Sequence, residues 1–329
     1  MKKTIYLYKS GTFNRKDFSL MFETKESKEY IPIEQVDCIF CFGDININKR
    51  VLSLLNGHNV SLVFFNYYGN YMGRFQPKKY TDGKILIQQI EAYQTKEVRL
   101  HLANAIIVAS LKNAISLLKY YRKQGYELDE TVIKLEEMVL LLKECATVEE
   151  ILLIEAQAKK LYYGCFDTVL KTTSFEFEIR SKNPPLNEIN ACLSYGYALL
   201  YGLILSELDK SRLLPQISFI HSLTKETDSL QFDLADIFKP ILIDRMLFRV
   251  CRRQQLKKEF FTFKSDGACF LNKEGIQFVI NEFETLLEQS IKIGNKYYSY
   301  RSLIRREIYN LTNTIKGKAK EYKPFVMRW

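Results

Sequence analysis

Four ionisable side chains in the second half of the chain have types and spacing that could bind a cation. His221 ends a short apolar run, and the helix-like stretch behind it contains Asp233, Asp236 and Asp244. At about 100° per residue the three aspartates project onto one otherwise apolar face. Like charges there repel, and a divalent cation that accepts carboxylate and imidazole ligands would remove the conflict. The alternative is that the aspartates are solvated first-turn residues and His221 is a core histidine.

A further carboxylate lies on the apolar side of an expected helix. Glu155 projects between Ile151 and Tyr162, whereas Glu149 and Glu150 open the helix, where carboxylates suit its dipole. Burying an ionised carboxylate without a partner is costly, so Glu155 needs a cation, a hydrogen-bond partner or a raised pKa. Pairing with an arginine is the simple alternative.

Basic residues gather in two segments, 245–264 and 301–329. The chain has 48 Lys and Arg against 38 Asp and Glu, a balance of +10 that favours polyanionic partners. Its 21 tyrosines and 22 phenylalanines offer rings that can stack on bases. Such basic runs are also typical of solvated helix faces. The first of them follows the acidic residues directly, and a cation site beside a positive groove suits phosphodiester chemistry.

The first 77 residues have the composition of strands. They are rich in Ile, Val, Phe and Tyr and are interrupted by Gly, Asn and Asp turns. One short helix, at 48–56, is expected among them. The expected strands are 3–9, 18–23, 30–42 and 60–67.

From residue 85 onward the apolar period is helical. A length of 329 residues predicts two domains. The sequence therefore predicts an α+β protein, with a small sandwich-like N-terminal β domain at 1–77, a linker at 78–84 and a large, mostly α-helical catalytic domain at 85–329. The expected helices are 85–123, 129–144, 148–170, 187–209, 230–260, 273–291 and 300–318, with a hairpin at 261–271.

The seven cysteines are scattered and odd in number. With no secretory segment before them, they are expected to be reduced thiols of a cytoplasmic protein. Cys38 and Cys41 form a C-x-x-C pair, but no second pair completes a zinc site. The longest uncharged run, 189–206, approaches membrane-spanning length. Its polar and glycine residues favour a buried central helix, so no membrane partner is expected.

Several short motifs follow one another in a fixed order along the chain. Lys112-Asn113 lies in the first long helix, and Y-K-P-F begins at Tyr322 near the end. Between them are E-A-Q-A-K-K-L-Y-Y from Glu155, Arg180 with Pro184-Pro185 and N-A-C-L-S-Y-G-Y from Asn190, S-F-I-H ending at His221, and D-L-A-D-I-F-K-P from Asp233.

Together these motifs resemble the CRISPR-associated integrase family, the Cas-one protein of spacer acquisition, over the whole chain. The resemblance implies that Glu155, His221 and Asp236 hold a Mg²⁺ or Mn²⁺ ion. It implies that Asp233 supports them, as a further ligand or as a hydrogen-bond acceptor behind them. The imidazole makes Mn²⁺ plausible beside Mg²⁺, which prefers oxygen ligands. The residues expected to contact DNA are Lys239, at the mouth of the site, with Arg180, Arg245, Arg252, Arg253 and Lys257.

The resemblance also implies a function in CRISPR adaptation. The 3′-hydroxyl ends of a prespacer DNA would attack the CRISPR repeat in metal-dependent transesterifications, and water in place of the hydroxyl would give endonuclease activity. The family forms homodimers through the β domain. It assembles with the small ferredoxin-like Cas-two protein into a hetero-hexamer on double-stranded DNA.

Two positions depart from the family pattern, and two other functions compete with it. Ser218 replaces a glycine, and Asn187 stands where an aspartate is usual. A non-catalytic basic DNA-binding scaffold with a structural acidic cluster is the main alternative. A zinc hydrolase is disfavoured because the chain has three histidines and no H-x-x-x-H spacing.

Overall fold

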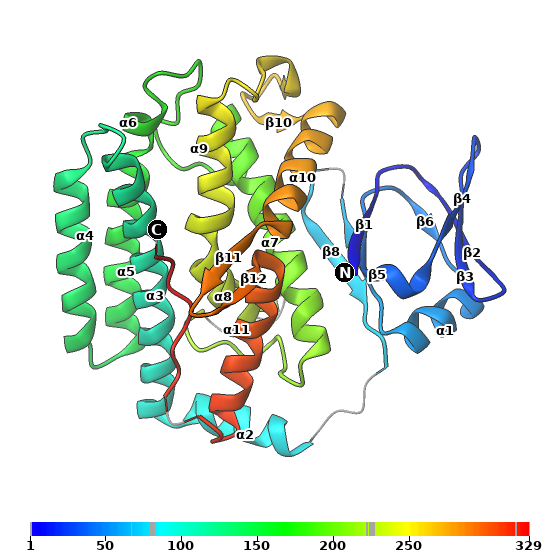
Figure 1. The fold of residues 1–329 in the computed structure, drawn as a ribbon, viewed down its shortest axis with the longest axis horizontal. Coiled ribbons are helices and arrows are strands. Elements are labelled where there is room, and N and C mark those ends of the chain that lie inside the picture. Colours follow the sequence, from blue (N-terminus) through cyan, green and yellow to red (C-terminus); the bar gives the residue numbers. More distant parts are fainter. Residues whose placement is uncertain are drawn as a thin grey trace.

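The computed structural model describes residues 2–66, 68–78, 83–221, 223, 228–319 and 321–328. Strands come first and helices follow, which confirms the α+β class (Figure 1). The N-terminal elements are β1 (Lys3–Leu7), β2 (Gly11–Lys16), β3 (Ser19–Glu23), β4 (Lys28–Ile31), the 3₁₀ turn η1 (Ile33–Gln35), β5 (Val36–Cys41), β6 (Ile45–Asn46), α1 (Lys49–His58), β7 (Ser61–Phe65) and β8 (Tyr71–Phe75).

These strands form two four-stranded sheets. The first has the order β1-β5-β7-β8, in which β8 alone is antiparallel to its neighbour. The second has the order β4-β3-β2-β6, in which β6 is parallel to β2 and the other pairs are antiparallel. Phe13 and Leu20 of the second sheet share a buried core with Ile39 and Leu62 of the first. The N-terminal strands are therefore arranged as a sandwich.

Strand β5 is buried on both faces because its side chains alternate between two cores. Ile39 and Cys41 belong to the core of the sandwich. Cys38 and Phe40 belong to the larger core, which continues into the helices. The division at 1–77 and 85–329 stays a prediction, because one core spans it and part of the expected linker, 79–82, lies outside the described residues.

The second part of the chain is mostly helical. Within it, α7 packs against the first sheet and against the later helices of the chain (Figure 1). The elements are α2 (Gly83–Gln94), α3 (Lys96–Arg122), α4 (Asp129–Leu141), η2 (Leu142–Glu144), α5 (Val148–Gly164), α6 (Phe166–Leu170), α7 (Glu188–Lys210), α8 (Leu230–Lys239), the π-helical η3 (Pro240–Asp244), α9 (Arg245–Arg252), η4 (Lys258–Phe260), β9 (Phe261–Phe263), β10 (Cys269–Leu271), α10 (Lys273–Glu288), β11 (Ser290–Ile293), β12 (Lys296–Ser299) and α11 (Tyr300–Ile315).

Several expected elements were wrong in extent. The strand expected at 30–42 is divided into β4, η1 and β5, and the helix expected at 148–170 is divided into α5 and α6. The helix expected at 85–123 is two helices, because Thr95 between α2 and α3 has an extended backbone. The helix expected at 230–260 ends at Arg252, and Gln254 has a positive φ of 55°. The helix expected at 273–291 ends at Glu288, and β11 and β12 form a hairpin behind it. Gly294, with a φ of 59°, supplies the left-handed turn that this hairpin needs.

Helices α3 and α7 are, among the described residues, the two that are long and apolar enough to cross a membrane. Their apolar stretches are mostly inside the protein, 61% buried in α3 and 83% in α7. The uncharged run at 189–206 lies within α7, where the sequence predicted a buried central helix. Both helices thus have the burial that core helices of a folded domain show.

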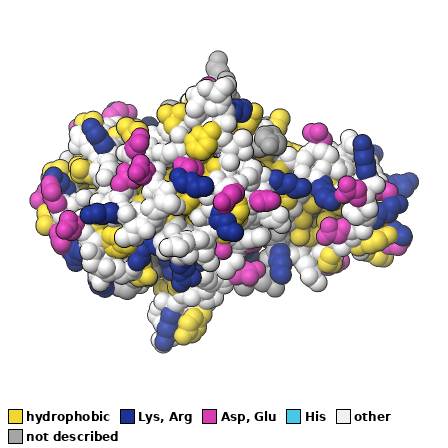
Figure 2. Space-filling view, turned by 90° about the horizontal axis from the view of Figure 1, so that it is seen from above, with side chains coloured by type: hydrophobic (Ala, Val, Ile, Leu, Met, Phe, Trp, Pro, Cys, Tyr) yellow, Lys and Arg dark blue, Asp and Glu magenta, His cyan; other side chains and the backbone are white. Residues whose placement is uncertain are grey.

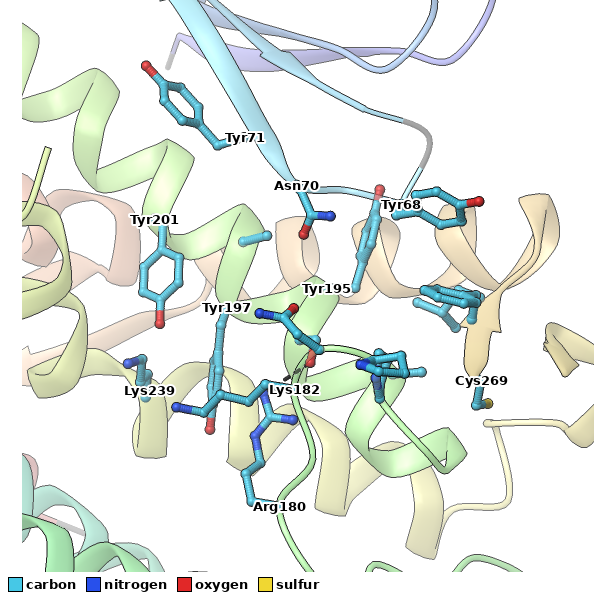
Figure 3. A pocket seen from close by; sticks show the side chains of 18 of the residues that line it. Tyr68, Asn70, Tyr71, Arg180, Lys182, Tyr195, Tyr197, Tyr201, Lys239 and Cys269 are labelled. Atoms are coloured by element: carbon cyan, nitrogen blue, oxygen red, sulfur yellow. Dashed lines mark hydrogen bonds between the residues drawn. The ribbon is translucent and has the colours of Figure 1, made fainter. Parts of the chain in front are cut away.

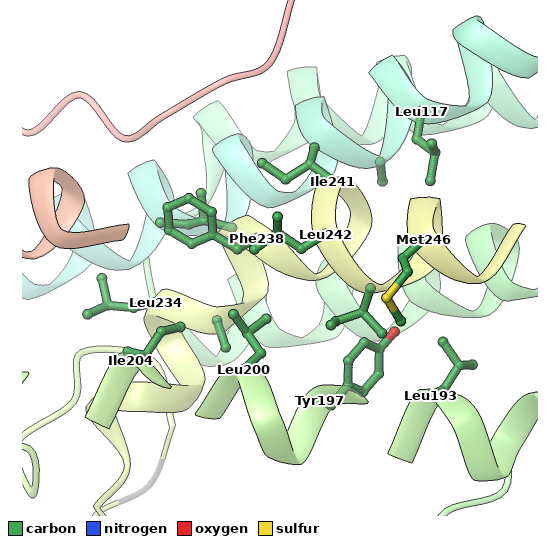
Figure 4. Packing of buried hydrophobic residues seen from close by; sticks show 14 of the residues in the cluster. Leu117, Leu193, Tyr197, Leu200, Ile204, Leu234, Phe238, Ile241, Leu242 and Met246 are labelled. Carbon is green, nitrogen blue, oxygen red and sulfur yellow. The ribbon is translucent and has the colours of Figure 1, made fainter. Parts of the chain in front are cut away.

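Helix α8 and the segment η3 lie between α3 and α7, and their apolar side chains pack against both (Figure 4). Leu234, Phe238 and Leu242 are at most 1% exposed. Because Asp233 and Asp236 are on this same helix, their backbone is held on two sides by the core.

One end of the molecule is acidic although the chain as a whole is basic. Residues 127–154 contain eight Asp or Glu and two Lys, and they form most of α4 and the start of α5. In Figure 2 acidic, basic and apolar side chains mix at the left end, where Figure 1 shows α4. This end is therefore a poor surface for a polyanion.

Candidate functional site

Helices α5 and α8 bring two of the predicted ligands together. Asp236 is 1% exposed and Glu155 is 7% exposed. The ammonium group of Lys159 lies 3.1 Å from Oδ2 of Asp236 and also forms an ion pair with Oε1 of Glu155. On the other side, Nζ of Lys239 lies 2.5 Å from Oδ1 of Asp236. Two carboxylates from separate helices thus meet at a buried place that positive charge must occupy.

Asp233 holds the third predicted ligand, His221, in a fixed orientation. Its Oδ1 lies 2.6 Å from Nδ1 of the imidazole, and its Oδ2 accepts hydrogen bonds from the backbone N–H groups of Phe219 at 2.7 Å and Ile220 at 3.1 Å. Ser218 closes the turn by donating to the carbonyl of His221 at 2.6 Å. With a proton on Nδ1 the other ring nitrogen, Nε2, keeps its lone pair for a ligand. Asp233 is thus occupied as an acceptor behind His221.

The charges of the site act on one another. Burial alone would raise the pKa of Asp236, but Lys159 and Lys239 outweigh it and lower that pKa. Burial raises the pKa of Glu155, and Lys159 offsets only part of the effect. Burial alone would lower the pKa of His221, but the hydrogen bond to Asp233 and the nearby carboxylates raise it overall. Glu155, His221 and Asp236 therefore lie within electrostatic reach of each other.

The donor set fits a hard divalent cation, but it is not closed around one. Within the described ranges, no three His, Cys, Asp or Glu side chains lie close enough together to hold a metal ion as they stand. The ammonium of Lys159 takes the space between Glu155 and Asp236. Oε1 of Glu155 is buried without a well-formed hydrogen bond, and its neighbour is that ammonium. Two carboxylates and an imidazole suit Mg²⁺ or Mn²⁺ once Lys159 moves aside.

Asp244 does not join Glu155 and Asp236 in the carboxylate site, and the common helix face expected for it and Asp236 stays a prediction. It accepts hydrogen bonds from the hydroxyls of Tyr162 at 2.8 Å and Tyr197 at 2.7 Å. Burial raises the pKa of Asp244 to about 6, although these hydrogen bonds oppose the shift. Asp244 lies eight residues beyond Asp236, more than two turns along the helix, so it meets α5 at Tyr162 rather than at Glu155.

A cavity of about 810 Å³ opens beside the carboxylates. Tyrosines from α7 and from the β7–β8 connection line it (Figure 3), and so do Lys159 and Lys239. Arg180 and Lys182 reach into it from the loop before α7. Burial and the neighbouring cations lower the pKa of Lys182, so binding of an anion here would be electrostatically favourable. The tyrosines of this pocket are Tyr68, Tyr71, Tyr163, Tyr195, Tyr197 and Tyr201.

Two of the six residues expected to contact DNA line this pocket. Arg180 donates to Asn190 at 2.9 Å and to Ser194 at 3.1 Å. Lys239 is bound to Asp236 and lies over the rings of Tyr197 and Tyr201. Both cations are thus partly engaged within the protein, and Lys239 belongs to the carboxylate site rather than to its rim.

The other four lie elsewhere. Arg245 donates to the hydroxyl of Tyr300 at 2.7 Å. Arg252 lies over the rings of Tyr121 and Tyr126 and donates to Gln124 at 2.5 Å. Arg253 and Lys257 are exposed at the end of α9 and after it. None of the four lines the pocket, so any contact they make with DNA is to a part of it outside the site.

Sequence reasoning missed Lys159 and Lys182. Lys159 stands four residues after Glu155 on α5, the spacing at which helix side chains meet, so that signal was present. Lys182 lies two residues after Arg180, and nothing in the sequence places it beside the carboxylates. The pocket tyrosines were likewise visible only as part of a composition rich in aromatic residues.

Comparison with known proteins identifies the family of the chain. The family model for CRISPR associated protein Cas1 matches residues 5–285. A CRISPR-associated endonuclease Cas1 of Thermodesulfovibrio yellowstonii is 37% identical over 333 residues, with all of both chains covered. The solved structure of a Cas1 protein from Thermotoga maritima has a TM-score of 0.87 at 30% identity and covers 97% of this chain and 98% of its own.

A more distant structure shares the fold alone. It is a casposase bound to integration product, with a TM-score of 0.86 at 20% identity and coverage of 100% of this chain and 95% of its own. The family match extends from the first strand to α10, and it includes every residue of the carboxylate site and of the adjoining pocket. The chain belongs to the CRISPR-associated Cas1 family.

Proposed function

We propose that this Cas1-family protein is a metal-dependent DNA integrase and endonuclease of CRISPR adaptation. The observation that carries the proposal is the meeting of Glu155 and Asp236 around one positive charge, beside a pocket of cations and tyrosines. Buried carboxylates that share a cation are typical of sites that use a divalent ion on phosphate. Family membership supports the same activity.

Glu155, His221 and Asp236 would hold a Mg²⁺ or Mn²⁺ ion. When bound, such an ion lowers the pKa of a hydroxyl and neutralises charge on the phosphate. Asp233 keeps the proton on Nδ1 of His221, which aims Nε2 at the site. Arg180 and Lys182 would bind the phosphates of the incoming strand, and the pocket tyrosines would stack on its bases.

The reaction needs no covalent bond to the protein. The 3′-hydroxyl of a prespacer end forms a new bond to a phosphorus of the CRISPR repeat, and the bond from that phosphorus to the neighbouring 3′-oxygen breaks. The hydroxyl proton leaves with the departing oxygen or with solvent. Water in place of the hydroxyl gives hydrolysis, which is the endonuclease activity.

Joining both ends of one duplex requires two sites at a fixed separation. We therefore propose a homodimer formed through the N-terminal strands and a hetero-hexamer with the small ferredoxin-like Cas-two protein, bound to double-stranded DNA in the cytoplasm. The acidic end around α4 would face away from the DNA, because residues 127–154 carry a net negative charge.

The test compares the ligand variants Glu155→Ala, His221→Ala and Asp236→Ala with Lys134→Ala, whose lysine lies on the acidic α4. Each protein is incubated with its partner, Mn²⁺ or Mg²⁺, a duplex with 3′-hydroxyl ends and a leader-repeat plasmid. The three ligand variants should lose joining and cleavage and still bind DNA. Unimpaired joining by Asp236→Ala would refute the proposal and favour a DNA-binding scaffold with a structural acidic cluster.

A further inference from the structure

One sequence motif that the proposed reaction does not use lies directly behind the site. Asn113 is fully buried on α3, and its side chain makes three hydrogen bonds. Its Nδ2 donates to the carbonyl of Ile237 at 2.8 Å and to that of Phe325 at 3.1 Å. Its Oδ1 accepts from the backbone N–H of Met327 at 2.7 Å. One side chain therefore joins α8 to the C-terminal segment, and both of its donors are in use.

The C-terminal segment 321–328, here called the strap, is held near both of its ends. Tyr322 donates to Glu307 of α11 at 2.6 Å, and the backbone N–H of Phe325 donates to the same carboxylate at 2.8 Å. The carbonyl of Met327 accepts from Ser116 of α3 at 3.0 Å. The strap thus connects α11 with α3, and Tyr322 and Met327 are buried along it.

Helix α8 needs support from outside at the place where Asn113 reaches it. Pro240 has no N–H, so the carbonyl of Asp236 lacks the donor that a regular helix supplies four residues later. From Pro240 the helix widens into η3. Asn113 donates to Ile237, whose carbonyl is the next one along. The hydrogen bond from Asn113 therefore fixes α8 where its backbone hydrogen bonds change from the α-helical to the π-helical pattern.

The strap presses on the face of α8 opposite the site. The ring of Phe325 stacks on that of Phe238, with centroids 6.2 Å apart and planes 6° apart. Residues two positions apart project about 200° apart around a helix, so Phe238 and Asp236 point in nearly opposite directions. A shift of the strap would therefore move Asp236 toward or away from Glu155 on α5.

We propose that Asn113 and the strap position α8 so that Asp236 stands at the right distance from Glu155 to share a divalent ion. Asn113 touches no ligand of the site, and it acts through the backbone of Ile237, so it is a positioning residue. This inference rests on the proposed function, because it assigns the strap to the same metal-dependent site.

The experiment measures binding of Mn²⁺ alone to the full-length protein by electron paramagnetic resonance, with no DNA present. Asn113→Ala should raise the Mn²⁺ dissociation constant about tenfold, the effect typical of residues that orient metal ligands. Amide hydrogen exchange in 233–240 should become faster in the same variant. Affinity for DNA should stay within about twofold, and saturating Mn²⁺ should restore the joining rate, which a general loss of folding would not allow.

Lys112→Ala is the matched control. Lys112 is next to Asn113 on the same helix, and its side chain is exposed. This variant should bind Mn²⁺ like the wild type. Phe325→Ala, which removes the ring from Phe238 and leaves the side chain of Asn113 intact, carries the same test if Asn113→Ala does not fold.

Wild-type Mn²⁺ affinity in folded Asn113→Ala and Phe325→Ala would overturn the proposal. A wild-type protein that neither binds Mn²⁺ nor joins DNA would instead overturn the proposed function, and this is seen before any variant is measured. The two failures are therefore distinguishable.

Discussion

Nδ1 of His221 lies 2.6 Å from Oδ1 of Asp233, and the same carboxylate holds the backbone of Phe219 and Ile220. In Asp233→Asn an amide group would face the imidazole, donate to Nδ1 and drive the proton to Nε2. That nitrogen would then be lost as a ligand. We expect Mn²⁺ affinity to fall about 10- to 100-fold in calorimetric titration. Unchanged affinity in Asp233→Asn would show that this hydrogen bond is only structural.

Lys159 should compete with the metal for Glu155 and Asp236. Without divalent ions, Lys159→Ala removes the ammonium that pairs with Glu155, so the melting temperature of the variant should fall by several degrees. Adding Mn²⁺ should stabilise this variant more than the wild type, because the ion no longer displaces an ammonium. Thermal unfolding with and without Mn²⁺ measures both effects.

The neighbouring Lys160, which is exposed, is the matched control for that experiment. Lys160→Ala should melt like the wild type and gain the same stability from Mn²⁺. Equal gains from Mn²⁺ in Lys159→Ala and the wild type would contradict the competition.

Lys182 should contribute to DNA affinity through charge alone. It lines the pocket beside Arg180, and burial and the surrounding cations lower its pKa, so a phosphate relieves repulsion there. Lys182→Ala should weaken binding of a duplex with a 3′ overhang in fluorescence anisotropy. The slope of log affinity against log salt should become shallower by about one. Lys134→Ala, on the acidic end, should change neither quantity, and an equal loss in both variants would argue against a local phosphate contact.

Asp244 should make stability depend on pH. An aspartate in the unfolded chain has a pKa of about 3.9. Burial raises the pKa of Asp244 to about 6 in the folded protein. The folded state therefore binds this proton more tightly than the unfolded state does. The contribution of Asp244 to the free energy of unfolding is at its full value below about pH 4 and is lost as pH rises through about 6. The full difference is about 3 kcal/mol.

Urea unfolding at pH 4.5 and pH 7 measures this dependence. Asp244→Asn stays neutral at both values, so its stability should decline less than that of the wild type over the interval. Parallel declines in the two proteins would assign the effect to other groups, such as Glu307, whose pKa burial also raises to about 6.

Local sequence pattern predicted the strands-then-helices order and the burial of Glu155 and Asp236. Those features follow from periodicity, which a single chain displays. The expected helix at 230–260 was too long at its end, because the apolar period does not reveal the positive φ of Gln254 that follows Arg252. Asp244 contacts Tyr162 and Tyr197 because it lies more than two turns along the helix from Asp236, where α5 and α7 present these hydroxyls.

The rest of the site depends on contacts between distant segments. Lys159 reaches Asp236 across 77 residues of sequence, and Asn113 reaches Met327 across 214. The family motifs indicated that Asn113 and Tyr322 occur together, but no spacing in the sequence says that they meet behind α8. Likewise Lys182, from the loop before α7, and Lys239, from α8, line the same pocket, which no spacing in the sequence predicts.

The side chains of strand β5 alternate between two hydrophobic cores, so the first sheet separates these cores and is buried on both faces. Removing residues 1–77 would remove Phe40 and Phe65 from the surface of α7 and expose apolar side chains of that helix to water. The contact between the first sheet and α7 is close at Gly202, since a methyl group there would come within 2.8 Å of Phe65. A shortened protein cut at the expected linker should therefore aggregate, and the two halves have to be handled as one piece.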